Sequence, residues 1–155
     1  PTKKEVIEKI FRIKKRSPKN YLPLFIKNIV MARKFAQTNR KQERFFKKVW
    51  PGRVTLVLTR KKRRDIYGIA PTTIALRVPD FKPLNLLLEK LDIPLTATSF
   101  NISGKPLSNN ITMILKQFIK NQYKPDLVVD IGSLPERKPS TIIDLTKKPP
   151  KILRM

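Results

Sequence analysis

The chain has 155 residues, 40% of them hydrophobic, which matches the size and composition of one folded domain. It contains no cysteine and no histidine, which excludes disulfides, a cysteine nucleophile, Cys/His zinc sites and a histidine general base. The 35 Lys and Arg residues against 11 Asp and Glu residues give a net charge of +24, which favours polyanionic partners such as RNA, DNA or nucleotides, although a lysine-rich proteome would explain the same excess.

In chain order, the patterns predict a helix over 3–14, a strand over 22–26, a helix over 29–49, strands over 54–59 and 72–78, a helix over 84–91, a strand over 95–99, a helix over 111–119, and strands over 127–131, 141–145 and 152–153. Thr2 and Glu5 fit a capping box for the first helix, and Asn109 or Asn110 can cap the last one. The charged segment 61–65 is predicted to close a hairpin. Interleaved helices and strands indicate an α/β or α+β domain with a mixed sheet over 1–155.

The chain shows no pattern of a membrane protein. No apolar run approaches the roughly 20 residues that span a bilayer. No basic, apolar and small-residue signal pattern opens the chain. We therefore expect a cytoplasmic protein that has no membrane partner.

The segment from Ser99 to Gly104 is the strongest candidate for a working site. Ser99, Asn101 and Ser103 occupy alternate positions at the end of a predicted strand, where alternate side chains point the same way. Gly104 lets the backbone approach a ligand closely or turn sharply. Because α/β sheets commonly bind ligands at the carboxyl ends of their strands, we expect the two hydroxyls and the amide to face one site.

Basic residues at two places, Lys14 with Arg16 and Arg77, can each serve either the fold or a binding site. Lys14 and Arg16 end the first helix, where cations complement the helix dipole; alternatively they form a phosphate clamp. Arg77 lies in an otherwise apolar strand, where a charge is costly unless it is paired. It either points to solvent or pairs with a structural Asp, or it meets a carboxylate or phosphate of a ligand together with Thr73, which shares its face.

Two further motifs lie near the predicted sheet. Ser140 and Thr141 place two hydroxyls at a strand start, either as a turn cap or as part of a site, and Arg154 can return to the same place. Trp50-Pro51-Gly52 is predicted to be a structural corner, because tryptophan is mainly a packing residue.

Together and in this order, the motifs resemble the YrdC/TsaC-type threonylcarbamoyl-AMP synthase family. The matching blocks are Lys14-x-Arg16-Ser17 with Asn20, Trp50-Pro51-Gly52-x-Val54-Thr55, Thr73-x-x-x-Arg77-x-Pro79, Ser99-x-Asn101-x-Ser103-Gly104-x-Pro106, Pro139-Ser140-Thr141-Ile142-Ile143-Asp144 and Ile152-Leu153-Arg154. They span nearly the whole chain. The resemblance implies a twisted mixed sheet with flanking helices and a large, basic, concave cavity.

The activity implied by the resemblance is that of a nucleotidyltransferase. It condenses L-threonine, bicarbonate or CO2, and ATP to threonylcarbamoyl-AMP and pyrophosphate, the first step of t6A modification of tRNA. The residues implied for ATP are Lys14, Arg16, Asn20, Thr73, Ser99, Asn101, Ser103 and Arg154. Those implied for threonine are Thr2, Arg77 and Ser140. Such chemistry works by positioning and charge neutralisation, so no nucleophile or general base is expected among the side chains.

The resemblance also implies one cofactor and several partners. Mg2+ would arrive with ATP and need few protein ligands, so no metal site made by the protein is expected. The further partners implied are tRNA or double-stranded RNA and a downstream t6A transferase complex.

The sequence departs from the family pattern at three places. Pro1-Thr2 runs directly into Lys3, whereas the family continues with a segment of the kind Pro-Thr-x-Thr-x-Tyr-Gly-Leu and has a strand before it. We expect a loop omitted after Thr2 rather than a shortened protein, because losing this segment should open the site. Leu107 stands where relatives often have a phosphate-binding serine. The sequence ends just after Arg154, and from this we expect a protein without the C-terminal domain of longer members.

Two alternatives stay open at this point. The charge of +24 and the missing segment fit a non-catalytic RNA-binding module of the same fold. A related domain also serves carbamoyl transfer within larger hydrogenase-maturation proteins, and we expect a different role here because these 155 residues show no zinc-finger-like or acylphosphatase-like part.

Overall fold

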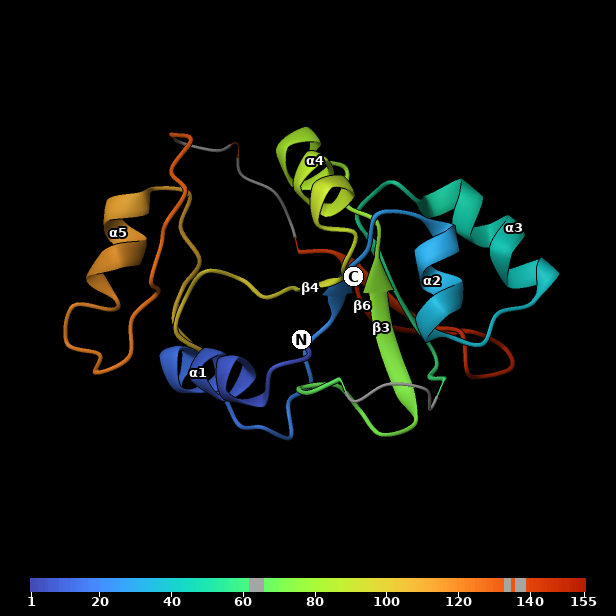
Figure 1. The fold of residues 1–155 in the computed structure, drawn as a ribbon, viewed down its shortest axis with the longest axis horizontal. Helices are drawn as coiled ribbons and strands as arrows, with labels where there is room; N and C mark the ends of the chain where they lie inside the picture. Colours follow the sequence, from blue (N-terminus) through green and yellow to red (C-terminus); the bar gives the residue numbers. More distant parts are fainter. Residues whose placement is uncertain (62–65, 133–134, 136–138) are drawn as a thin grey trace.

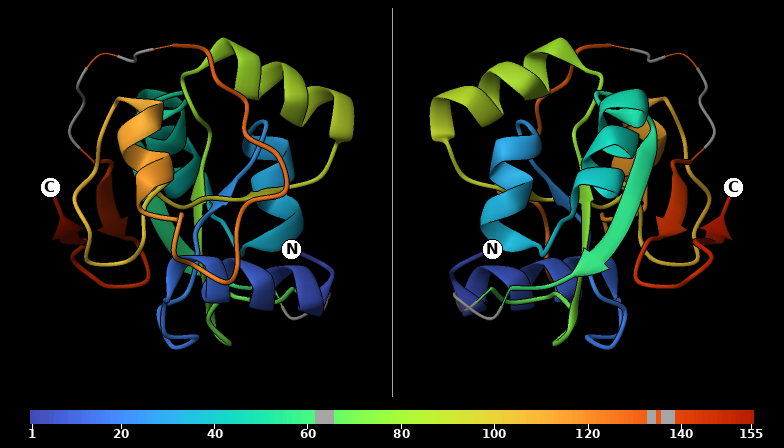
Figure 2. Two further views of the ribbon diagram at one scale, coloured as in Figure 1. Left: turned by 90° about the vertical axis from the view of Figure 1, so that its left-hand side faces the viewer. Right: turned by 90° about the vertical axis from the view of Figure 1, so that its right-hand side faces the viewer.

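The chain folds around one open mixed sheet with helices on both sides (Figures 1 and 2). This computed structural model describes residues 1–61, 66–132, 135 and 139–155. Its helices are α1 (Lys4–Lys14), α2 (Ile29–Phe35), α3 (Arg40–Val49), α4 (Lys82–Leu91) and α5 (Ile111–Lys116). Its strands are β1 (Leu24–Phe25), β2 (Val54–Thr59), β3 (Thr73–Arg77), β4 (Leu95–Thr96), β5 (Thr141–Asp144) and β6 (Lys151–Arg154). The predicted class, a mixed α/β sheet with flanking helices, is confirmed.

The sheet has the strand order β4-β1-β3-β2-β5-β6. Parallel pairing joins β1 to β3 and β2 to β5, whereas the other neighbouring strands pair antiparallel. Successive side chains of the central strand β3 point to opposite faces. Ile74 and Leu76 are buried in the core, whereas Thr73, Ala75 and Arg77 line a cavity on the other face.

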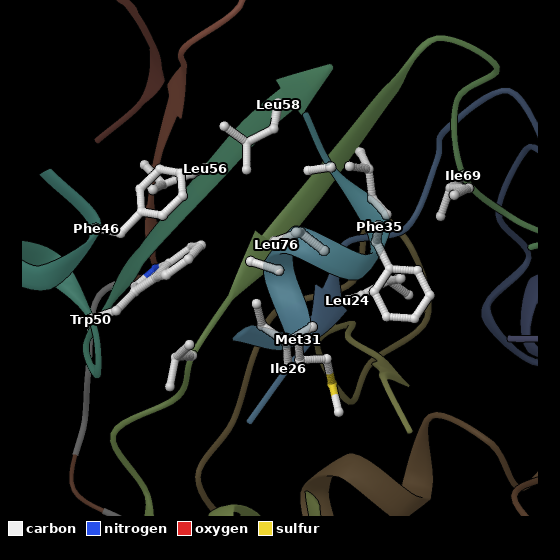
Figure 3. Packing of buried hydrophobic residues seen from close by; sticks show 14 of the residues in the cluster. Leu24, Ile26, Met31, Phe35, Phe46, Trp50, Leu56, Leu58, Ile69 and Leu76 are labelled. Atoms are coloured by element: carbon white, nitrogen blue, oxygen red, sulfur yellow. The ribbon is translucent and has the colours of Figure 1, made fainter. Parts of the chain in front are cut away.

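The main hydrophobic core lies between the sheet and the helices α2 and α3, which stand side by side in Figure 2. Figure 3 shows Phe46 and Trp50 next to each other against Leu56 of β2. The centroids of the two rings are 4.9 Å apart. Met31 of α2 packs into the same cluster with Leu76 of β3. Burial of each such side chain contributes about 1.5–3 kcal/mol to folding. This packing leaves the opposite face of the sheet for a site.

The Trp50-Pro51-Gly52 segment is a structural corner between α3 and β2, as predicted. The Trp50 indole donates to the Val54 carbonyl (2.7 Å), and the Gly52 amide donates to the Val78 carbonyl (3.0 Å). A Cβ on Gly52 would lie 2.5 Å from the Val49 carbonyl oxygen, so only glycine fits here. The corner therefore ties the start of β2 to the end of β3.

Residues 29–49 form two helices, so the prediction of one helix over this range was wrong. The chain leaves helical geometry at Ala36, which forms an isolated bridge with Arg60. Asn39 then starts α3, because its side chain accepts from the Gln42 amide while the Gln42 side chain accepts from the Asn39 amide. Such a capping box competes with continued helix and begins a new one.

An ion pair holds α2 against α3 and leads to a prediction about acid stability. Arg33 donates two hydrogen bonds to Glu43 (2.7 and 2.6 Å), and these bonds, with one from Thr38, lower the pKa of Glu43 from 4.5 to about 2. A depressed carboxyl pKa stabilises the fold above pH 4.5, and this stabilisation is lost as the pH falls toward 2. Glu43→Gln should therefore flatten the fall of the thermal midpoint between pH 5 and pH 2. Glu89→Gln on α4 is the matched control, and an equal fall in both variants would contradict the prediction.

The structure corrects the predicted ends of several elements. Lys3, not Thr2, precedes α1, and no side chain caps this helix, so the capping box of Thr2 and Glu5 was wrong. Asn110 caps α5 by accepting from the Met113 amide (3.2 Å). The predicted strands over 22–26 and 95–99 shorten to two residues each, because β1 and β4 pair with each other over only that length.

The predicted strand over 127–131 is wrong. These residues lie outside the sheet, and Leu127 and Val129 are exposed. A strand needs a hydrogen-bonded neighbour, and the described sheet ends at β4 and β6 without reaching this segment. Of the predicted hairpin end over 61–65, residues 62–65 lie outside the described part, although β2 and β3 pair antiparallel on either side of it. No described helix has the length and apolar character needed to cross a membrane.

Candidate active site

A cavity of about 580 Å³ lies on the face of the sheet opposite to α2 and α3. This volume lies within the range of about 300–1,000 Å³ that is typical of small-molecule sites. The predicted site residues that line it are Arg16, Thr73, Arg77, Ser99, Ser140 and Arg154. No Asp or Glu is among the described residues of its wall, whereas three arginines are. The arrangement suits an anionic ligand.

Arg77 is held at the end of β3 without a carboxylate partner. Its Nε donates to the Gly52 carbonyl (2.8 Å), and its guanidinium carbon lies 5.7 Å from the centre of the Phe25 ring. Burial lowers the pKa of Arg77, and the charge of Arg53 lowers it further, against an opposing effect of Asp80. Among the described residues, no carboxylate forms an ion pair with it. Arg77 therefore lines the cavity and is not paired with a described carboxylate, and its contact with a ligand stays a prediction.

Arg16 is fixed at the mouth of the cavity by main-chain carbonyls. After α1, Lys15 adopts a left-handed conformation (φ 49°) that reverses the chain. Arg16 then donates through Nε to the Asn20 carbonyl (2.8 Å) and through Nη2 to the Tyr21 carbonyl (3.2 Å). The Asn20 side chain itself is exposed and does not line the cavity, so its predicted contact with ATP stays a prediction.

Lys14 lies beneath the cavity wall and not in it. Its side chain is buried, with 4% exposed, and its Nζ donates to the main-chain carbonyls of Ser99 and Asn101 and to Oδ1 of Asn101 (3.3 Å). Burial, and then the charge of Arg16, lowers the pKa of Lys14 from 10.5 to about 8. The ammonium therefore holds the 99–101 loop, and its predicted contact with phosphate stays a prediction.

The loop from Ser99 to Gly104 does not continue a strand, so the predicted alternation of its side chains was wrong. β4 ends at Thr96, and the Asn101 amide turns back to donate to the Ser99 carbonyl (3.1 Å). Ser99 lines the cavity, whereas Asn101 is buried and the exposed Ser103 is not among the residues that line it. The roles of Asn101 and Ser103 toward ATP stay predictions.

Asn101 is an organiser of this loop. Its Oδ1 accepts from the Ser99 hydroxyl (2.6 Å), and its Nδ2 donates to the Lys105 carbonyl (2.6 Å). The Ser103 amide donates to the Lys14 carbonyl (2.8 Å), which ties the loop to the end of α1. Through these bonds the buried Lys14 and Asn101 position Ser99 at the cavity.

The structure shows where two of the positions that depart from the family pattern lie relative to the cavity. Thr2 is exposed and outside the cavity wall, so its contact with threonine stays a prediction. Leu107 does line the cavity, with its side chain largely exposed. The neighbouring Ser108 does not line the cavity, and its hydroxyl accepts from the Asn110 amide (3.1 Å) before α5.

Sequence reasoning gave no role of its own to Thr55, which the structure places in the site. Thr55 of β2 is 3% exposed and lines the cavity, and its Oγ1 lies 3.1 Å from Oγ of Ser140. Arg154 donates to the same Ser140, through Nε and Nη2 to its carbonyl (3.1 and 2.9 Å) and through Nη2 to its hydroxyl (3.1 Å). A threonine in a strand is too common to mark a site, so only the folded arrangement identifies it.

The fold and the cavity define a class: mixed-sheet α/β domains with a cavity on one face of the sheet, here lined by three arginines. The Sua5/YciO/YrdC family model, described as telomere recombination, matches residues 1–155, and the chain belongs to this family. The resemblance found in the sequence motifs is thereby confirmed.

Two relatives are named as synthases. The chain is 34% identical over 142 residues to the putative threonylcarbamoyl-AMP synthase of Methanocaldococcus jannaschii, covering 91% of this chain and 65% of the relative. It is 32% identical over 151 residues to the threonylcarbamoyl-AMP synthase of Pyrococcus abyssi, covering 96% of this chain and 43% of the relative. The chain thus spans less than two thirds of the length of either protein.

Solved structures share the fold. P. abyssi Sua5, in its complex with L-threonine, matches 99% of this chain and 45% of its own with a TM-score of 0.85 and 30% identity. Escherichia coli YciO matches 97% of this chain and 73% of its own with a TM-score of 0.82 and 27% identity. The fold predicted from the motifs is therefore confirmed.

Proposed function

We propose that this domain is an L-threonylcarbamoyladenylate synthase, which condenses L-threonine, bicarbonate or CO2, and ATP to threonylcarbamoyl-AMP and pyrophosphate. The observation that carries the proposal is the convergence of Arg16, Arg77 and Arg154 on one cavity whose described wall has no carboxylate. The names of the two synthase relatives and the threonine complex of P. abyssi Sua5 support the same activity.

The reaction needs charge neutralisation and alignment more than a nucleophilic side chain. In the proposed arrangement Arg77 binds the threonine carboxylate, for which a planar guanidinium offers two parallel donors. Arg16 and Arg154 neutralise the triphosphate of ATP, and the hydroxyls of Thr73 and Ser99 supply neutral contacts. The enzyme class that we propose is accordingly a nucleotidyltransferase.

Mg2+ fits this site only as a companion of ATP. Among the described residues, no group of three His, Cys, Asp or Glu side chains could hold a metal ion, and the described cavity wall offers hydroxyls and guanidinium groups. Mg2+ binds well to phosphate oxygens while keeping several waters, and it neutralises phosphate charge there. We therefore propose that the cation is bound through the nucleotide.

The tRNA and the downstream t6A transferase complex follow from the proposed product. Threonylcarbamoyl-AMP is an activated intermediate that has to be transferred to tRNA by another enzyme. The net charge of +24 would favour an encounter with tRNA. A role in tRNA modification also fits the cytoplasmic setting predicted from the sequence.

Pyrophosphate release tests the proposed activity directly. Purified protein with ATP, Mg2+ and bicarbonate should release pyrophosphate only when L-threonine is added, and the adenylate should be detectable by mass spectrometry. Omission of bicarbonate and replacement of threonine by valine are the matched controls. RNA binding with a steep salt dependence and no nucleotide binding would instead favour an RNA-binding module and defeat the proposal.

A further inference from the structure

Polar side chains cross the cavity face of the sheet in a row that runs from β3 to β6. The antiparallel register pairs Leu56 with Leu76, and Thr55 and Arg77 are the next residues beyond this pair on the two strands; both line the cavity. On its other side Thr55 contacts the Ser140 hydroxyl (3.1 Å). Thr55 therefore stands between the arginine proposed for the threonine carboxylate and the serine predicted to lie near the amino acid.

The number of hydrogen bonds that the Ser140 hydroxyl can form determines what Thr55 can do for it. A serine hydroxyl accepts two hydrogen bonds and donates one. One acceptor position of Ser140 is taken by Nη2 of Arg154 (3.1 Å). If Thr55 donates to the second, the single O–H of Ser140 is left to donate to a ligand in the cavity.

Burial requires a hydrogen-bond partner for the Thr55 hydroxyl. Thr55 is 3% exposed, and buried hydroxyls are nearly always hydrogen-bonded. Among the described residues, the hydrogen bond of its hydroxyl goes to Ser140. The main chain of β5 also holds Ser140 in place, since the Thr141 amide donates to the Arg53 carbonyl (3.1 Å). The positions of both hydroxyl oxygens are thus held, and only the direction of the Ser140 O–H is left to vary.

We propose that Thr55 is a positioning residue, which directs the Ser140 O–H to an oxygen acceptor of the amino-acid substrate. This inference rests on the proposed function. It predicts an effect confined to one substrate: Arg154 keeps both hydrogen bonds to the Ser140 carbonyl when Thr55 is changed, so the nucleotide end should be unaffected.

Steady-state kinetics of Thr55→Val test the proposal. Losing one orienting hydrogen bond should raise the KM for threonine about 3- to 10-fold, while the KM for ATP stays within about twofold. Thr55→Ser keeps the hydroxyl and should restore the KM for threonine. Thr59→Val is the matched control, because Thr59 lies on the same strand and on the same face but outside the cavity wall. Thr55→Ala removes the γ-methyl group together with the hydroxyl and should raise the KM for threonine in the same way.

A double-mutant cycle separates positioning from a general structural effect. Because Thr55 acts through Ser140, Thr55→Val should change the KM for threonine by less than about twofold when Ser140→Ala is already present. Full additivity, an unchanged KM in Thr55→Val, or equal rises in both KM values would overturn the proposal.

Crystal structures of Thr55→Val and Thr55→Ser give a readout that does not need activity. The Ser140 hydroxyl should rotate away from Nη2 of Arg154 in the first variant and keep its place in the second. An unchanged Ser140 in Thr55→Val would defeat the positioning role. A wild-type protein without threonine-dependent pyrophosphate release would defeat the proposed function instead, so the two failures are distinguishable.

Discussion

Lys14→Met is expected to lower the free energy of unfolding by about 2–4 kcal/mol, because it leaves buried acceptors without a donor. The acceptors are the carbonyl oxygens of Ser99 and Asn101 and Oδ1 of Asn101. Methionine fills a similar volume but donates no hydrogen bond. Urea unfolding at neutral pH measures the difference.

The same variant should weaken nucleotide binding at least about tenfold, because the loop that presents Ser99 to the cavity loses its anchor. Calorimetry with a non-hydrolysable ATP analogue measures this effect. Lys15→Met, at the exposed neighbouring position, removes the same charge without touching the loop. Equal stability and affinity in Lys14→Met and Lys15→Met would contradict the anchoring role.

The lowered pKa of Lys14 predicts how its contribution to stability depends on pH. The folded protein holds the pKa at about 8, whereas the unfolded chain has the usual 10.5. Between these values the unfolded state binds more protons, so the stability contributed by this group rises with pH. The gap in unfolding free energy between the wild type and Lys14→Met should therefore widen between pH 8 and pH 10, and a constant gap would argue against it.

Arg77→Ala is expected to weaken the response of pyrophosphate release to threonine strongly. A hydrogen bond between charged groups contributes about 1.5–3 kcal/mol, so kcat/KM for threonine should fall roughly 10- to 150-fold. ATP-analogue binding should stay within about twofold, because Arg16 and Arg154 remain. Pyrophosphate release at increasing threonine concentration, together with calorimetry of the nucleotide, measures both.

Two further variants sharpen the interpretation of Arg77. Arg53→Ala removes a neighbouring exposed charge that does not line the cavity, and it should leave threonine dependence intact. Arg77→Lys keeps the charge but loses the two parallel donors, so it should recover only part of the activity. An Arg77→Ala enzyme that still responds to threonine as the wild type does would rule out the proposed carboxylate site.

The sequence predicted the site best where a regular strand carries it. On β3, the period of two correctly placed Thr73 and Arg77 on one face, because β3 is hydrogen-bonded on both sides and keeps its alternation. The same argument failed for Ser99 and Asn101, since β4 ends before them and the loop follows its own hydrogen bonds. Alternation is therefore informative only where pairing enforces it.

Other parts of the site depend on contacts between distant parts of the chain. Lys14 meets its acceptors across 85 and 87 residues of sequence, so no local pattern could show that it is buried. Thr55 and Ser140 likewise meet across 85 residues, through the parallel pairing of β2 and β5. Helix-end and strand patterns placed these residues in the right elements, but only the fold shows which partner each one has.

The three cavity arginines are each held by hydrogen bonds to main-chain carbonyls, and this affects how they bind an anion. Arg16 is held by the Asn20 and Tyr21 carbonyls, Arg77 by the Gly52 carbonyl, and Arg154 by Ser140. A carboxylate would fix a guanidinium equally well but would cancel its charge. Main-chain carbonyls instead preorganise these side chains and leave their full charge for the incoming anion, so little rotamer entropy is lost when the anion binds.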